Sequence, residues 1–335
     1  MSLPVTASPS LPRALLLGLI ATAFLSAQSP AVDTQPLTIT LTPTGGSQSA
    51  PHGKGNIYAP DVHFHAGRYL MWFGGQGRDG HDRIQLAEST DGERWQSRGV
   101  VLEDPTANHV NDPSVVRHGD TWYMYYTRAA SDVLDEIALA TSRDGVHWQP
   151  RGIVLRPSHA PNWDSLLVGR PSVLVDRGKF RMWYDGRRDL PLGAPAKDAP
   201  KSAASSRSVG YAESDDGIHW RRPQREPVFT ADAGGIHVAR TPSGFAMVYE
   251  SHAGTQLATS PNGLTWRSQG TLAPISGTTT DRFGHVTPCL FLDPANHRYA
   301  LFVGAARSAS WDQNTIAKIP LTSNRESQLT TPAKK

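Results

Sequence analysis

The apolar residues of this chain fall in short runs that alternate with polar residues, and turns rich in glycine and proline separate the runs. Four runs lead into one phrase: IQLAESTDGERW (84–95), IALATSRDGVHW (137–148), VGYAESDDGIHW (209–220) and TQLATSPNGLTW (255–266). Asp-Gly and Asn-Gly favour the positive φ angles of tight hairpin turns. Each copy therefore predicts a strand, a two-residue turn and a second strand.

A second phrase precedes the hairpins and reads as strand, Gly- or Pro-bearing turn, aromatic-rich strand. It occurs five times, at 58–75, 111–127, 169–186, 235–251 and 287–305. Joined to a hairpin, each copy makes a unit of four antiparallel strands. Five such units predict an all-β fold, a five-bladed β-propeller, because each twisted sheet buries both faces against its neighbours.

The ends of the propeller follow from where the pattern stops. The fifth unit lacks the Asp-Gly-x-x-Trp phrase, and 36–42 alternates apolar residues with threonine, so we expect that strand to complete the last blade. We place a linker with this strand at 28–50, the propeller at 51–321 and a disordered polar tail at 322–335. The insertion 187–207 predicts a mobile loop on one face, either solvated filler or a flexible lid.

The N-terminus predicts export. A polar lead with Arg13, the apolar run 14–25 and the small residues Ser26 and Ala27 have the layout of a signal peptide over 1–27. The mature protein is then secreted or periplasmic. The single cysteine, Cys289, forms no internal disulfide and is expected as a small buried hydrophobe. The net charge of +3, without a Lys/Arg run longer than two, argues against a nucleic-acid partner.

Residues that differ between the units identify one mouth of the propeller. Because paired strands are antiparallel, the start of the first strand and the end of the second lie at the same end of each blade. Aligned on their prolines, the first strands start with Ala59, Asp112, Arg170, Gly235 and Thr287, and the second strands end with Gly74, Thr127, Asp185, Glu250 and Gly304. Asp61, two positions after Ala59, lies on the same strand face. A structural core would repeat one residue type here.

Several carboxylates at one mouth raise one another's pKa unless cations intervene, and Arg128, Arg170, Arg187, His237 and His285 are placed to do so. Two carboxyl groups with different pKa values are what glycosidic cleavage needs. The alternative is that the acids cap turns or pair with arginines, above all Asp185 in Tyr-Asp-Gly-Arg. Trp163 and Asp164 precede the third blade as an entry loop, where Trp163 would stack on a sugar or cover a blade edge.

The Ser-x-Asp-Gly-x-x-Trp phrase is interpreted as scaffold. Its acidic residue or asparagine begins a turn, its tryptophan is spaced to pack between blades, and four units cannot all be active sites. The phrase also lacks the residue that the sialidase Asp-box has between Asp and Gly.

These residues resemble a known group. YAPDVHFHAGRYLMWF (58–73) resembles the Ala-Pro-Asp segment of family 43 glycoside hydrolases, and VNDPSVV (110–116) resembles the Asp-Pro strand starts of families 43, 32 and 130. The blade pattern resembles the five-bladed arabinanase/levansucrase/invertase superfamily. The resemblance implies a carbohydrate substrate and polysaccharide degradation. We expect a monomer without stable membrane association and without a cofactor.

The resemblance also implies roles. Asp112 matches the acidic residue before proline, the base or nucleophile. Asp61 matches the Asp of the Ala-Pro-Asp segment and is expected as an orienting or pKa-setting carboxylate of the catalytic set. The general acid of family 43 stands in Glu-Gly-Pro, where this chain has Gly169, Arg170 and Pro171. Glu250 is the substitute acid by position, and Arg170, His237, His285, Asp185, Trp163 and Asp164 are the expected substrate-binding residues.

Two other functions stay open, as does a central ion. A phosphorylase would hold phosphate with Arg170 and His285, and a non-catalytic propeller would bind glycans after losing its acid. Sister enzymes carry a central ion, but the alternating His63 and His65 are more typical of an ordinary strand, and no metal site is predicted.

Overall fold

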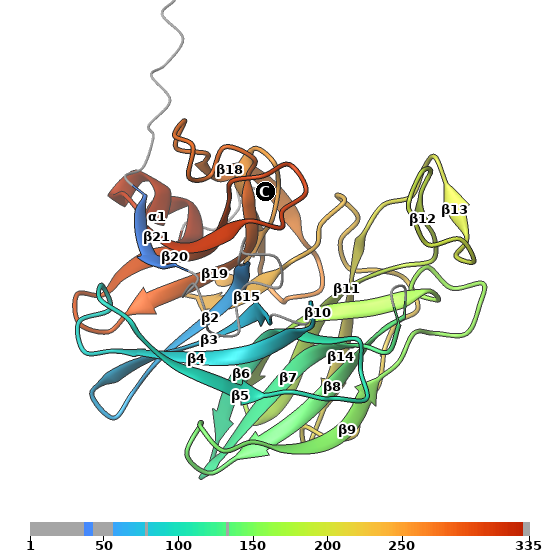
Figure 1. Cartoon of the computed structure of the whole chain (residues 1–335), viewed down its shortest axis with the longest axis horizontal. Helices are drawn as coiled ribbons and strands as arrows, with labels where there is room; N and C mark the ends of the chain where they lie inside the picture. Colours follow the sequence, from blue (N-terminus) through green and yellow to red (C-terminus); the bar gives the residue numbers. More distant parts are fainter. Residues whose placement is uncertain (1–36, 43–55, 78–79, 132–133, 331–335) are drawn as a thin grey trace, which may run out of the picture. The chain divides into compact units, whose positions relative to one another are not determined.

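Antiparallel sheets make up almost all of the structure, a computed structural model that describes residues 37–42, 56–77, 80–131 and 134–330. Five sheets form a five-bladed β-propeller (Figure 1). The expected signal peptide, and the linker outside 37–42, lie beyond the described residues.

The sheets follow the chain in order. The first holds β2 (Ile57–His65), β3 (Arg68–Gln76), β4 (Asp82–Ser89) and β5 (Gln96–Leu102), and the second holds β6 (His109–His118), β7 (Thr121–Ala129), β8 (Asp135–Ser142) and β9 (Gln149–Leu155). The third holds β10 (Leu167–Asp176), β11 (Lys179–Arg187) and β14 (Ser208–Ser214). The fourth holds β15 (His237–Thr241), β16 (Gly244–Tyr249), β17 (Gly254–Ser260) and β18 (Arg267–Pro274).

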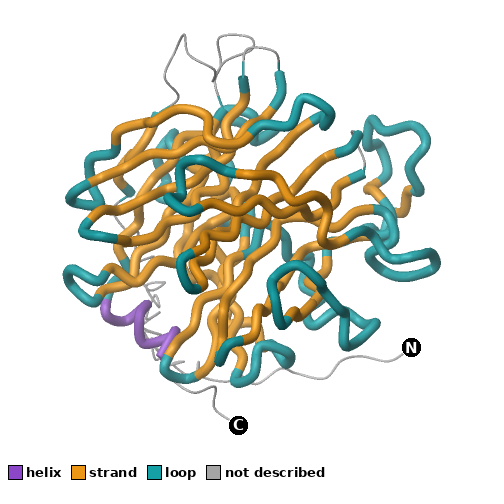
Figure 2. The backbone as a smooth tube through the Cα atoms, turned by 90° about the horizontal axis from the view of Figure 1, so that it is seen from below, coloured by secondary structure: helices purple, strands orange, loops and turns teal. Residues whose placement is uncertain are grey.

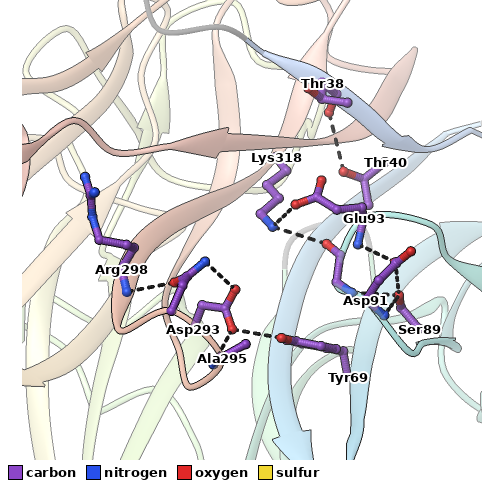
Figure 3. A network of polar contacts seen from close by, with 12 residues as sticks. Thr38, Thr40, Tyr69, Ser89, Asp91, Glu93, Asp293, Ala295, Arg298 and Lys318 are labelled. Carbon is purple, nitrogen blue, oxygen red and sulfur yellow. Dashed lines mark hydrogen bonds and ion pairs between the residues drawn. The ribbon is translucent and has the colours of Figure 1, made fainter.

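The fifth sheet closes the ring with the N-terminal strand. Its order is β1 (Thr38–Leu41), β21 (Asn314–Pro320), β20 (Arg298–Ala306) and β19 (His285–Asp293), so β1 takes the place expected of it. Polar contacts join this sheet to the first (Figure 3). Lys318 Nζ donates to Gly92 O at 3.3 Å and pairs with Glu93 at 2.5 Å, and the Tyr69 hydroxyl donates to Asp293 at 2.8 Å.

The third sheet departs from the expected four strands. Its outer edge is reduced to two isolated bridges, Val209 with Phe229 and Glu213 with Arg221. Pro223 and Pro227 lie in this edge segment. Because proline has no N–H to donate to a ladder, the segment cannot form a continuous fourth strand.

The repeated phrase forms a longer turn than the two-residue hairpin predicted. In the first copy, β4 ends at Ser89 and β5 begins at Gln96, and Gly92 has φ 71°. The Ser89 hydroxyl accepts the N–H groups of Asp91 and Gly92, and the Asp91 carboxylate accepts those of Glu93 and Arg94. The prediction of a two-residue turn was wrong, because the Ser89 and Asp91 side chains accept hydrogen bonds from the backbone N–H groups of a longer turn.

The scaffold interpretation of the phrase is confirmed by its contacts between blades. Trp72 of the first sheet donates its indole N–H to Gly145 O in the phrase of the second, at 3.0 Å. Trp183 of the third sheet makes the equivalent bond to Gly263 O of the fourth, at 2.7 Å. Both indoles are fully buried. The turn glycines are therefore fixed by aromatic side chains of the preceding blade.

The polar tail expected to be disordered contains a helix, α1 (Ser323–Thr330), which Figure 2 shows at the edge of the strands. Leu329 is fully buried in the apolar cluster of the fourth and fifth sheets, and Glu326 pairs with Arg298 at 2.8 Å. One buried leucine and this ion pair hold the segment in place. Among the described residues, no helix is long and apolar enough to cross a membrane.

The insertion carries a short parallel pair, β12 (Leu190–Pro191) with β13 (Lys201–Ser202), and extends from the end of β11 (Figure 1).

Candidate active site

A β-bulge shapes the start of the innermost strand in four blades. In each, two residues oppose one on the partner strand, between Tyr58 and Asp61, Asn111 and Ser114, Gly169 and Ser172, and Val286 and Cys289. The first bulged residue has positive φ: Ala59 51°, Asp112 51°, Arg170 46° and Thr287 40°, with Gly235 at 54° in the fourth blade. These five residues are the ones that the proline alignment makes equivalent. Left-handed non-glycine residues cost roughly 1–3 kcal/mol each and are concentrated at functional sites.

The residue that ends the second strand of one blade binds the bulge of the next blade. Thr127 Oγ1 accepts the Arg170 N–H at 2.8 Å, an Asp185 oxygen accepts the Gly235 N–H at 3.3 Å, and a Glu250 oxygen accepts the Thr287 N–H at 3.1 Å. These three side chains thus have a structural role in addition to any chemical one. Gly74 and Gly304 hold the same position without a side chain.

A second ring of bonds lies further along the inner strands and contains Asp61 and His237. In each bond, a side chain of one inner strand accepts a backbone N–H of the next. Asp61 accepts from Val115 at 2.6 Å, and Ser114 accepts from Val173 at 2.9 Å. Ser172 accepts from Val238 at 2.8 Å, and His237 accepts from Leu290 at 3.3 Å. Each bond runs from one blade to the next. Despite burial, the charges of His63 and His237 hold the pKa of Asp61 far below its usual range.

Asp61 and His237 also line a cavity of about 370 Å³, so the catalytic role expected of Asp61 and the sugar-binding role expected of His237 stay predictions. Both belong to this inter-blade ring, and Asp61 is 3% exposed. The two side chains face each other at 3.7 Å, so their polar atoms are engaged within the protein. Period-two alternation placed Asp61 on the face of Ala59, but the intervening bulge breaks that alternation.

Three other expected substrate-binding residues are buried in the scaffold. His285 is fully buried between Asp281, at 3.1 Å, and Thr255, at 2.9 Å. Asp164 is 1% exposed, accepts the Tyr184 hydroxyl at 3.0 Å and pairs with Arg222 at 3.2 Å. Asp185 is fully buried. Each of the three makes its polar contacts with other residues of the protein.

Trp163 packs on the blade edge. Its ring stacks on Tyr184 with 5.9 Å between centroids, and its indole N–H donates to Arg225 O at 2.9 Å. Of the two roles that the sequence left open for Trp163, these contacts match the cover of a blade edge.

The mouth itself holds alternating charges on the second, third and fourth blades. Arg170 pairs with Asp185 at 3.2 Å and lies 4.0 Å from Asp112. Arg207 forms an ion pair with Glu250 and lies 4.0 Å from Asp185. Asp112 and Glu250 are both nearly buried. The structure thus brings together four residues expected from the sequence and adds Arg207.

The two mouth carboxyl groups that remain candidates differ in protonation. Burial raises the pKa of Asp112 to about 7, since the positive charge of Arg170 is opposed by Asp185 and Glu250. Burial also acts to raise the pKa of Glu250, but Arg207 and Arg170 outweigh it and lower the pKa below the usual value. Near neutral pH, one carboxyl group can carry a proton while the other is ionised.

Asp135 and Arg207 were missed by sequence reasoning. Both precede the repeated phrase by two residues, where the first unit has Asp82. The third strand starts at the same end of the blade as the second strand finishes, so extending the alignment by two positions reveals them. Burial and Asp185 raise the pKa of Asp135 to about 6, against the opposing charge of Arg170.

Comparison with known proteins supports the fold. Residues 103–262 match the glycosyl hydrolases family 32 N-terminal domain. The structure aligns with that of a thermostable family-43 glycoside hydrolase at a TM-score of 0.62 and 16% identity, covering 84% of this chain and 93% of that one. The chain has the fold of the five-bladed β-propeller glycoside hydrolases.

Two further propeller hydrolase structures align over similar lengths. A family 117 glycoside hydrolase from Zobellia galactanivorans gives a TM-score of 0.63 at 15% identity, covering 86% of this chain and 90% of that one. A structure described under the GH130 family of mannoside phosphorylases, which contains glycoside hydrolases that target beta-1,2 mannosidic linkages in Candida mannan, gives 0.63 at 14% identity, covering 91% and 97%. At these identities the propeller fold is what is shared.

Curated relatives align over shorter stretches. An uncharacterized protein of Mycobacterium tuberculosis is 28% identical over 208 residues, which span 57% of this chain and 65% of that protein. A probable sucrose-6-phosphate hydrolase of Psychromonas ingrahamii is 38% identical over 77 residues, 22% of this chain and 14% of the relative. The chain thus spans less than two thirds of the length of either relative.

Proposed function

We propose that the protein hydrolyses glycosidic bonds in an oligo- or polysaccharide, with Asp112 as general acid and Glu250 as the ionised partner. The observation that carries the proposal is one mouth with two electrostatically coupled carboxyl groups whose pKa values are displaced in opposite directions. Such a pair separates acid from base in glycosidases. Export through the N-terminal segment is part of the same proposal.

The electrostatics reverse the roles expected from the family resemblance. A general acid must be protonated at the working pH, and Asp112, with a pKa of about 7, meets this condition better than Glu250. After proton transfer, Arg170, 4.0 Å away, stabilises the Asp112 carboxylate that forms. Glu250 stays ionised beside Arg207 and serves as base toward water or as nucleophile.

The first experiment is turnover by the purified protein of arabinan, xylan, fructan and mannan oligosaccharides. Asp112→Asn and Glu250→Gln should each lower kcat by about 10²- to 10⁴-fold. Asp144→Asn, in an exposed turn, is the folded control. Unchanged turnover in both mouth variants would contradict the assignment.

A second measurement separates the two roles. With aryl glycosides whose leaving group needs no proton, Asp112→Asn should recover most of its rate, while Glu250→Gln should stay slow. The anomer released first, followed by NMR, shows whether Glu250 acts as nucleophile with retention or as base with inversion.

A glycan-binding protein without catalysis is the second candidate, and one observation favours it. One Glu250 oxygen faces Arg207 and the other accepts the Thr287 N–H, so neither oxygen is free. In that case the wild-type protein binds an oligosaccharide without turning it over, and Asp112→Asn leaves the affinity unchanged. The phosphorylase alternative has less support, because His285, one of its two expected phosphate ligands, is buried.

A further inference from the structure

The insertion in the third blade begins and ends at the mouth. Arg187 is the last residue of β11, two positions after Asp185, and its carbonyl accepts the Leu166 N–H at 3.0 Å. Arg207 immediately precedes β14, and its N–H donates to Asp232 at 2.9 Å. The backbone of both arginines is therefore fixed by hydrogen bonds, and the segment between them carries β12 and β13 (Figure 1).

The three arginines of the mouth differ in their partners. Arg170 is paired with Asp185 and Arg207 with Glu250. Within the ranges that the structure describes, the Arg187 guanidinium makes no hydrogen bond or ion pair, although it is half-buried. Two acids act on Arg187 through their charge, and their hydrogen bonds go to other groups: Asp185 accepts from Arg170, and Asp232 accepts the Arg207 N–H.

An uncommitted cation in this position is unfavourable without a ligand. Burial and the charges of Arg207 and Arg170 lower the pKa of Arg187, and the opposing charges of Asp185 and Asp232 do not fully offset them. A partly desolvated guanidinium next to other cations gains most from an anion brought by a ligand. The adjacent mouth is where the proposed function places the saccharide.

We propose that Arg187 binds a carboxylate on the saccharide, so that the substrate of the proposed hydrolysis is an acidic glycan containing a uronic acid. A single guanidinium offers a planar fork that matches one carboxylate with two parallel hydrogen bonds. Binding of free phosphate would need a second cation that has no partner in the protein. Arg170 and Arg207 do not meet this need, because both already pair with acids of the protein. The insertion that distinguishes the third blade then sets specificity by supplying Arg187.

The test compares two oligosaccharides of one linkage, a uronate and its neutral hexose counterpart, by calorimetry with the full-length protein. Wild type should prefer the uronate, and Arg187→Gln should lower the uronate-to-neutral affinity ratio by about 10- to 100-fold. Arg187→Lys, which keeps the charge without the fork, should fall between them. Arg188→Gln, exposed on the same insertion, should keep the wild-type ratio.

The possible outcomes of binding and turnover measurements separate this inference from the proposed hydrolysis. Turnover of neutral substrates with no uronate preference overturns the acidic-glycan inference and leaves hydrolysis standing. Uronate binding that depends on Arg187 but without turnover supports the inference and overturns hydrolysis. Arg187-dependent binding of inorganic phosphate, or of a sulfated saccharide, without uronate binding overturns the carboxylate assignment, and binding of none of these ligands overturns both proposals.

Discussion

The guanidinium of Arg207 forms an ion pair with the Glu250 carboxylate, and the two residues are 43 positions apart in different blades. The pair connects the end of the insertion to the mouth. It also neutralises the negative charge nearest the bulge at Thr287. Arg207 thereby fixes both the position of Glu250 and its ionisation.

Removing Arg207 should raise the pKa of Glu250, because this guanidinium does most to offset the burial of the carboxylate. In Arg207→Gln, the acidic limb of kcat/KM against pH should move upward by at least about one pH unit. The alkaline limb, set by Asp112, should stay in place. An unmoved acidic limb would show that Glu250 is not the group that titrates.

The wild-type profile should be bell-shaped. The protein is active with Glu250 ionised and Asp112 protonated, so activity should be lost below the usual glutamate value of 4.5 and again as pH rises through about 7. Asp112→Asn should abolish the alkaline limb in whatever activity remains. An alkaline limb that survives in this variant would assign it to another group.

Asp112 should also make folding stability pH-dependent. Its folded pKa of about 7 lies above the ordinary value of 3.8, so its favourable contribution is fully present below pH 3.8 and is lost as pH rises through 7. Asp112→Asn, which cannot ionise, should therefore gain stability relative to wild type between about pH 4 and 8, on the order of a few kcal/mol. Urea denaturation across pH measures this, and a constant difference would mean that the pKa is not raised.

The repeated turn supplies its own control. Asp144 Oδ1 accepts the N–H groups of Val146 and His147, and Asn262 makes the same two bonds in the fourth copy. Asp144→Asn should leave the free energy of unfolding within about 0.5 kcal/mol, whereas Asp144→Ala should lose about 1–2 kcal/mol. Equal losses in the two variants would show that the charge, and not the capping oxygen, stabilises the turn.

The C-terminal helix should contribute measurably to stability. Leu329 is fully buried and Leu192 is 66% exposed. Leu329→Ala should cost about 2–4 kcal/mol, and Leu192→Ala should stay within about 0.5 kcal/mol. If the two substitutions had the same small effect in thermal denaturation, α1 would not be docked in solution.

Part of the site could be found from the sequence because it follows from repetition. Aligning the blades on their prolines identified the five bulge residues, and antiparallel pairing placed Glu250 and Asp185 at the same mouth. Both steps need only a regular repeat. The same logic extends to Asp135 and Arg207 once the third strand is included.

The remainder depended on packing that a repeat pattern does not encode. By strand alternation alone, Asp61 and Ala59 would lie on the same face of the strand. The β-bulge between them instead places the Asp61 side chain in the inter-blade ring. His285 and Asp164 have polar side chains typical of a site, but their hydrogen-bond partners come from other segments and bury them.

The sequence by itself determined the number of blades, the strand that closes the ring and the scaffold role of the repeated phrase, because these follow from local periodicity and turn residues. Only the tertiary structure decided which carboxyl group holds a proton. The pKa values of Asp112 and Glu250 depend on burial and on arginines from distant positions, Arg170 and Arg207. Charge interactions through space have no signature in residue spacing.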